Sequence, residues 1–152
     1  MKSSEDKVKS VISEYEQAMR DLEIKFEEKI QLELKARSDE IKNNKDKYPN
    51  FWLNALSNHK LFKDFITIED VEVLKHLEDI SYRKEKEGSN FTLIFIFGKN
   101  DFFTNEVLEK TYKINDELLI EEIVSTEINW LKRNIAFQVK DKKMKNKSIF
   151  LI

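Results

Sequence analysis

The sequence predicts an α+β fold, in which a long N-terminal helix is followed by short helices and then by an antiparallel β-sheet of about four strands. Three observations lead to this prediction. Residues 4–46 contain no glycine or proline and have apolar residues at helical spacing. The only proline of the chain, Pro49, ends that pattern. From residue 80 onward, β-branched and aromatic residues form short runs between turn signals, which is typical of strands.

The long helix has features of a coiled coil. Ser3 or Ser4 is suited to cap its start. Glu5 and Asp6 would lie in its first turn, where the helix dipole favours negative charge. Its apolar residues are spaced alternately four and three apart, with one four-four step near the end, which is close to heptad spacing. These positions are Val8, Ile12, Tyr15, Met19, Leu22, Phe26, Ile30 and Leu34.

The length of this helix predicts a partner for it. About forty helical residues span roughly 60 Å, whereas the remaining hundred or so residues form a body about 35 Å across. Burying eight apolar side chains that would otherwise overhang this body is worth on the order of 10 to 20 kcal/mol before entropy costs. We therefore predict that residues 1–47 are a dimerisation helix. The alternative is a helix that breaks and folds back on its own domain, although no breaking residue precedes Pro49.

Short helices are expected after the proline. One helix restarts after Pro49 and buries the aromatic pair Phe51 and Trp52. Thr67 followed by Asp70 resembles a capping box, so another helix should begin directly after Thr67. Its apolar residues are expected to be Val71, Val73, Leu74 and Leu77.

The sheet completes an α/β domain over residues 48–152. Residues 80–82 are interpreted as one strand. Residues 91–97 are apolar at nearly every position, as a central strand covered on both faces would be. Residues 107–114 alternate as a third strand does. Residues 116–130 fit a helix and a strand equally well, because both periods occur there.

Composition excludes several classes of protein and site. The chain has 37% charged residues, a net charge of −2 and no cysteine, which rules out disulfides and thiolate metal sites. Its start lacks the apolar core of a signal peptide, and no apolar run reaches membrane-spanning length. We therefore expect an intracellular, soluble protein that does not interact with membranes.

The sequence shows little that indicates catalysis. His59 and His76 have no partner at metal-ligand spacing, and neither a glycine-rich phosphate loop nor a nucleophile elbow is present. Paired carboxylates are frequent, but in so charged a chain they are typical of solvated surface. We expect no enzyme activity, no bound metal and no cofactor.

Charge is balanced overall but not locally. Residues 101–127 hold eight acidic residues against Lys110 and Lys113, a local net charge of −6. From residue 131 to the end, seven Lys or Arg residues face one acidic residue, a local net charge of +6. The lysine-rich segment 140–147, within the basic stretch 131–147, could contact nucleic acid phosphates or be bound by nuclear import factors. A solvated loop is the simpler interpretation.

Three segments in order resemble the nucleosome assembly protein (NAP)/SET family of histone chaperones, over roughly residues 48–130. They are YPNFWLNALSNHKLFKDFITIEDVEVLKHLEDI, FTLIFIFGKNDFFTNEVLEKTYKI and STEINW. The resemblance implies a homodimer whose paired long helices form a spine, with an α/β "earmuff" domain at each end. It further implies that acidic surfaces of these domains bind core histones and assist nucleosome assembly and disassembly without ATP, in the nucleus and the cytoplasm.

The acidic region agrees with the implied partner, because histones are strongly cationic and clustered carboxylates attract such proteins. The predicted histone-binding residues are Asp116, Glu117, Glu121, Glu122, Glu127, Glu106 and Glu109. The runner-up function is a dimeric coiled-coil module that docks non-histone partners and has no assembly activity. A nucleic-acid binder that uses residues 140–147 is a third interpretation.

The chain also departs from the family pattern. The family often has glycine where Asn50 and Ser125 stand here, and asparagine tolerates the left-handed backbone that glycine favours. The family also continues into acidic helices and an acidic tail after the basic segment. The sequence ends near the point where these helices would begin, as expected of a fragment, a shortened member or a specialised member. Part of the histone-binding surface would then be missing, and weaker histone binding is expected.

Overall fold

The structure is a computed structural model of the 152-residue chain, and it describes residues 3–85, 89–115 and 117–131. The chain divides into two compact units, residues 1–40 and 41–152. Along the chain, a long N-terminal helix is followed by two short helices and then by four antiparallel strands. The predicted α+β fold is therefore confirmed. In the part of the chain that is described, no helix is long and apolar enough to cross a membrane.

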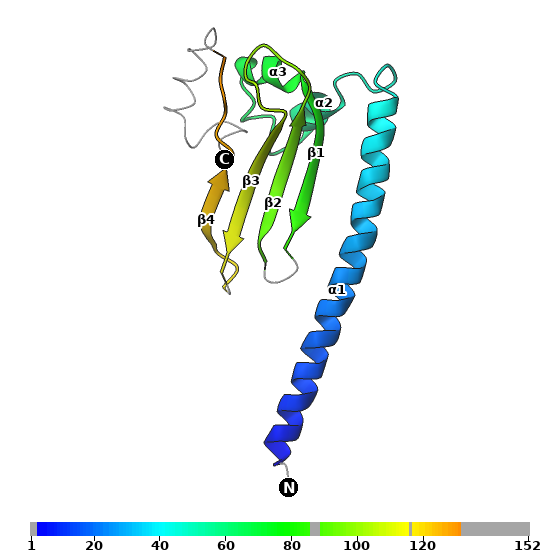
Figure 1. Cartoon of the computed structure of the whole chain (residues 1–152), viewed down its shortest axis with the longest axis vertical. Coiled ribbons are helices and arrows are strands. Elements are labelled where there is room, and N and C mark those ends of the chain that lie inside the picture. Colours follow the sequence, from blue (N-terminus) through cyan, green and yellow to red (C-terminus); the bar gives the residue numbers. More distant parts are fainter. Residues whose placement is uncertain (1–2, 86–88, 116, 132–152) are drawn as a thin grey trace. The chain divides into compact units, whose positions relative to one another are not determined.

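Helix α1 (Ser4–Asn43), blue to cyan in Figure 1, forms the first unit and continues for a few residues beyond it. The Ser3 Oγ atom accepts a hydrogen bond from the Asp6 amide at 3.2 Å, and the Ser3 amide donates to the Asp6 carboxylate at 3.1 Å. These two reciprocal bonds are a capping box, which satisfies amides that the first turn leaves without partners. The helix does not break within its 40 residues.

Helix α2 (Phe51–Asn58) begins at a left-handed residue. Helix α1 ends at Asn43, slightly before the end of the predicted helical pattern, and a turn lies between it and Pro49. A proline at position 49 excludes one continuous helix through α1 and α2. Asn50, with φ of 51° and ψ of 38°, then redirects the chain into α2. Asparagine is among the few residues other than glycine that tolerate this conformation. The Trp52 indole N–H donates to the Glu78 carbonyl at 3.0 Å and joins α2 to the sheet.

Helix α3 (Ile68–Leu74) begins at the predicted capping box. The Asp70 amide donates to Thr67 Oγ1 at 3.2 Å, and the Thr67 amide donates to the Asp70 carboxylate at 2.8 Å. The helix is shorter than predicted, because Leu77 belongs to the next strand. Leu77 pairs with Phe97 across the sheet and is only 6% exposed. The strand pairing and the burial therefore outweigh the helical spacing that assigned Leu77 to α3.

The sheet has the strand order β1-β2-β3-β4, and all its pairs are antiparallel (Figure 1). Its strands are β1 (Leu77–Lys84), β2 (Phe91–Phe97), β3 (Val107–Ile114) and β4 (Ile120–Ser125). The second and third strands have the predicted bounds, whereas β1 is longer than the predicted residues 80–82. The segment that fitted helix and strand equally well contains β4, so strand pairing resolves that ambiguity. Ser125 ends this strand without a left-handed backbone.

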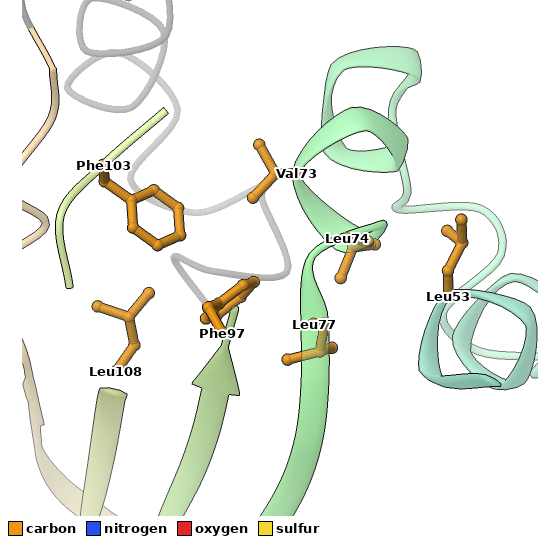
Figure 2. Packing of buried hydrophobic residues seen from close by; sticks show 7 residues of the cluster. All are labelled: Leu53, Val73, Leu74, Leu77, Phe97, Phe103 and Leu108. Atoms are coloured by element: carbon orange, nitrogen blue, oxygen red, sulfur yellow. The ribbon is translucent and has the colours of Figure 1, made fainter. Parts of the chain in front are cut away.

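The core lies at one end of the sheet, where α2 and α3 meet it (Figure 2). Phe97 and Phe103 pack edge to face with ring centroids 5.1 Å apart, and Trp130 packs on Phe103 in the same way at 5.7 Å. The buried cluster comprises Leu53, Val73, Leu74, Leu77, Phe97, Phe103 and Leu108. This cluster supports the sheet from which the charged residues described below project.

The two faces of the sheet differ in chemistry. On one face, Phe91 stacks on Tyr112 with centroids 4.8 Å apart, and Lys110 lies buried nearby with 7% exposure. Burial lowers the pKa of Lys110, because it disfavours the charged form. On the opposite face the Thr92 and Thr111 hydroxyls share a hydrogen bond of 2.9 Å. Ion pairs flank these two threonines, so this face is the polar one.

Candidate functional site

The turn between β3 and β4 is built around the side chain of Asn115. Its Oδ1 atom accepts from the amides of Glu117 (3.0 Å) and Leu119 (2.9 Å), and its carbonyl accepts from the Leu118 amide (2.9 Å). Leu118 has a φ of 62°, a left-handed conformation that costs a residue with a Cβ atom roughly 1–2 kcal/mol. The bonds to Asn115 offset this cost, and they hold Leu118 73% exposed.

Strand β4 is exposed along its whole length. Between residues 117 and 131 there is no lysine or arginine, and the four charged residues are glutamates, which gives this stretch a net charge of −4. All four are exposed: Glu117, Glu121, Glu122 and Glu127. The β3–β4 turn, β4 and the residues that follow it therefore form a purely acidic stretch of surface.

Two of the predicted histone-binding carboxylates already have cationic partners within the chain. Glu109 on β3 lies 3.6 Å from Arg83 on β1, and Glu122 on β4 lies 2.6 Å from Lys113 on β3. The hydrogen bond from Lys113 to Glu122 and the charge of Glu122 raise the pKa of Lys113. A cationic partner would have to compete with these contacts, which lowers its gain at both positions.

The other predicted residues differ in their surroundings. Glu117, Glu121 and Glu127 form no ion pair with any residue in the described ranges. Glu106 is exposed just before β3, and its carbonyl accepts from the Phe97 amide at 2.8 Å. Asp116 lies outside the described residues. The described carboxylates thus lie along the β3–β4 hairpin, with Glu117 in the turn at one end and Glu109 opposite Thr126 at the other.

Sequence reasoning missed Arg83 as part of this face. The segment around it was interpreted as a strand only over residues 80–82, so the alternation that orients Arg83 was not extended far enough. The register of β1 against β2 and of β2 against β3 brings Arg83 and Glu109 to the same side of the sheet. Long-range pairing of this kind leaves no signal in local sequence.

Apolar side chains accompany the acidic ones on the β3–β4 turn and on β4. Their exposed fractions run from 45% to 73%, although β-strands usually bury at least one face. They are Leu118, Leu119, Ile120, Ile123 and Val124. This surface can therefore contact a partner through both charge and apolar area.

Helix α1 carries a second exposed apolar surface. Seven of the eight positions predicted for dimerisation are 41% to 63% exposed in one copy of the chain: Val8, Ile12, Tyr15, Met19, Leu22, Phe26 and Ile30. Leu34 is half-buried. A stripe of this length at heptad-like spacing is suited to pairing with another helix.

Two other predictions concern metals and nucleic acids. Within the described ranges, no three histidine or acidic side chains come together as metal ligands would. The basic segment 140–147, and nearly all of the stretch 131–147, lie outside the described residues.

Comparisons with known proteins identify a matching family and several relatives. The model of the family described as "Nucleosome assembly protein (NAP)" matches residues 1–149. Over 84 residues the chain is 44% identical to nucleosome assembly protein 1;2 of Oryza sativa subsp. indica, which covers 54% of this chain and 23% of that protein. Over 100 residues it is 41% identical to a probable nucleosome assembly protein of Dictyostelium discoideum, with 65% and 31% covered. The chain thus spans about a quarter to a third of the length of these curated relatives.

Among solved structures, the crystal structure of nucleosome assembly protein S from Plasmodium falciparum is similar to the chain with a TM-score of 0.69. The two sequences are 19% identical, and the match covers 95% of this chain and 90% of that one. This likeness concerns the fold, which agrees with the long helix and four-stranded sheet described above.

Proposed function

Because the chain belongs to the nucleosome assembly protein family, as the resemblance of its sequence predicted, we propose that it is a histone chaperone. It binds core histones through the acidic surface of the β3–β4 turn and β4, and it assists nucleosome assembly and disassembly without ATP. The observation that supports this proposal most is the stretch 117–131, with four exposed glutamates and no basic residue.

The physical basis of binding is the sum of many weak contacts. An exposed ion pair contributes about 0.2–1 kcal/mol, and salt screens it. Glu117, Glu121 and Glu127 can attract lysine and arginine side chains without losing an ion pair to any residue that the structure describes. Glu122 and Glu109 contribute less, because Lys113 and Arg83 compete for them. We assign Glu106 and Asp116 to the same surface on the basis of sequence.

The proposal assigns dimerisation and histone binding to different parts of the chain. Residues 1–47 serve as a dimerisation helix through the α1 stripe, Val8 to Leu34, and residues 48–152 serve as the histone-binding domain. A chromatin role implies a nuclear location. Import factors that bind residues 140–147, and passage through the cytoplasm, remain predictions from the sequence.

Charge reversal at the surface tests the proposal. The double variant Glu121→Lys and Glu122→Lys should weaken binding to core histones about tenfold or more, because it replaces two attractions by two repulsions. Fluorescence anisotropy with labelled histone pairs, each tested separately over a salt series, measures the change. Wild-type binding should also weaken as salt rises.

A matched control separates the site from net charge. The variant Asp64→Lys and Glu72→Lys makes the same change in net charge at two exposed residues of the same compact unit, outside the stretch 101–127. It should lower the affinity much less. Equal losses in both double variants would show that only net charge matters and would remove Glu121 and Glu122 from the site.

The runner-up function has one observation in its favour. The internal ion pairs of Glu109 and Glu122 reduce the charge that is available to a histone. A dimeric module that docks non-histone partners would not compete with DNA for histones in a plasmid supercoiling assay. A chaperone should compete with DNA for histones and promote ordered supercoiling.

A further inference from the structure

The outer edge of β4 has no neighbour within residues 3–85, 89–115 and 117–131, where the sheet ends at this strand. The Phe97 amide donates to the Glu106 carbonyl at 2.8 Å, so even-numbered residues of β3 direct their backbone groups toward β2. The Thr126 amide donates to the Glu109 carbonyl at 2.9 Å, so odd-numbered residues of β3 face β4.

The same alternation orients the backbone of β4. Val124 and Glu122 lie opposite odd-numbered residues of β3, so their amides and carbonyls point toward that strand. The backbone groups of Ile123 and Ser125 therefore point away from the sheet. An edge of this kind, with unpaired donors and acceptors in extended conformation, can pair with another strand.

Side chains around this edge favour contact with a partner. Ile123 is 45% exposed and Val124 is 47% exposed, one on each face of β4. Leu118, which the Asn115 turn holds in a left-handed conformation, is 73% exposed at the end of the same hairpin. Natural sheets usually protect an exposed edge by lysine, proline or a bulge. Strand β4 has neither lysine nor proline, and its register irregularity lies between Ile120 and Glu122, before Ile123 and Ser125.

The charge of the edge selects the chemistry of its partner. Glu117, Glu121, Glu122 and Glu127 lie in the turn, on β4 and just after it, where no residue is basic, and Glu122 is the one among them that pairs with Lys113 of β3. A second copy of β4 would bring like charges together across the new pair, which is unfavourable. A basic partner would be attracted, and the apolar side chains that alternate with its basic ones would all lie on one face of its strand, where they would cover either Ile123 or Val124.

We propose that β4 is a strand-addition site, at which an extended, basic segment of a partner protein pairs with the outward backbone groups of Ile123 and Ser125 as a fifth strand. Main-chain hydrogen bonds supply affinity in this mode of binding, and alternate side chains supply specificity. The inference shares carboxylates with the proposed histone-binding surface, but it does not require the partner to be a histone.

Amide hydrogen exchange measured by NMR on the full chain tests this proposal directly. The probe is a synthetic peptide of about eight residues in which lysine and valine alternate, long enough to span β4. The peptide should slow exchange at Ile123 and Ser125 about tenfold or more, because their amides become hydrogen-bonded. Exchange at Val124 should change little, because its amide already faces β3. A peptide of alternating lysine and glycine should give weaker protection, since it lacks apolar side chains.

Two variants of one residue separate the backbone from the side chain. Ser125→Pro removes an outward amide at a sheet edge, where proline is tolerated, and should abolish the protection at Ile123. Ser125→Ala keeps that amide and should leave the protection unchanged. Because the peptide experiment on the wild-type protein needs no variant, the proposal can be tested even if Ser125→Pro does not fold.

Three outcomes would overturn the inference. Unchanged exchange at Ile123 and Ser125 on saturation with the peptide would mean that binding is only electrostatic. Strong protection of both amides in the free protein would mean that another part of the chain or a second copy covers the edge. Equal binding of the Ser125→Pro and Ser125→Ala variants would exclude the backbone contact. If histones bind but the peptide does not slow amide exchange at Ile123 and Ser125, only the added strand is refuted. If the peptide slows exchange at these amides but histones do not bind, only the proposed function is refuted.

Discussion

Charged residues in the middle of the α1 stripe should dissociate the proposed dimer. The variant Leu22→Glu and Phe26→Glu changes two apolar side chains that are 49% and 51% exposed in one copy. Burying the exposed half of such a side chain is worth about 1 kcal/mol, since full burial is worth about 1.5–3 kcal/mol. Seven exposed positions in each copy make fourteen in the pair, about 14 kcal/mol before the costs of association.

The double variant removes four of these fourteen contributions, about 4 kcal/mol, and it also places four carboxylates in the seam, where their desolvation is unfavourable. A loss of about 4 kcal/mol raises the dissociation constant about a thousandfold, because 1.4 kcal/mol corresponds to tenfold. Sedimentation velocity over a dilution series should show a dimer for the wild-type protein and a monomer for the variant at the same concentrations.

The variant Ser10→Glu and Ser13→Glu is the matched control for the seam. It adds the same two charges to exposed positions of α1, and Ser13 lies nine residues from Leu22, half a turn around the helix. It should sediment as the wild-type dimer does. A Leu22→Glu and Phe26→Glu variant that remains a dimer, or a wild-type chain that is monomeric throughout, would refute the seam.

Two further predictions concern the stability of the α/β unit. Thr67→Ala should lower the free energy of unfolding by about 1 kcal/mol, because it removes the hydroxyl that caps α3; urea unfolding measures this loss, and Thr67→Ser should restore most of it. Lys110→Met should raise the melting temperature at neutral pH, because burial of the charged amine is unfavourable and lowers the pKa of Lys110. Between that lowered pKa and the usual 10.5, the folded wild-type protein binds fewer protons than the unfolded chain, so its stability rises with pH. Thermal melts should therefore show that the advantage of Lys110→Met shrinks toward pH 10.5, and an advantage independent of pH would contradict the assigned cause.

Most of the fold could be predicted from the sequence, because its signals are local. The break between α1 and α2, the capping box of Thr67 and Asp70, and the strands β2 and β3 each depend on residues a few positions apart. The assignment of Leu77 to α3 was wrong, because its pairing with distant Phe97 decided between two compatible patterns. For the same reason, residues 116–130 could not be assigned until β4 was seen to pair with β3.

For the candidate site, the sequence predicts only that acidic residues are clustered between residues 101 and 127. Clustered carboxylates are visible in the sequence, but their availability depends on which cations the fold brings near them. Glu109 and Arg83 are 26 positions apart in the sequence. They meet because the register of β1 against β2 and of β2 against β3 places them on the same face of the sheet. Nothing in the local sequence distinguishes Glu109 from Glu121, although the former has an internal ion pair and the latter is exposed on the edge strand.

The sequence by itself determined the long helix with its apolar stripe, the change of period after the short helices, and membership of a family. These features depend on backbone restrictions and spacing, which act over a few residues. Only the tertiary structure decided that β4 is the last strand of the sheet within the described residues, that Ile123 and Ser125 direct their backbone groups away from β3, and which carboxylates are already paired. Those properties arise from contacts between residues that are distant in sequence, and the register of the strands sets them.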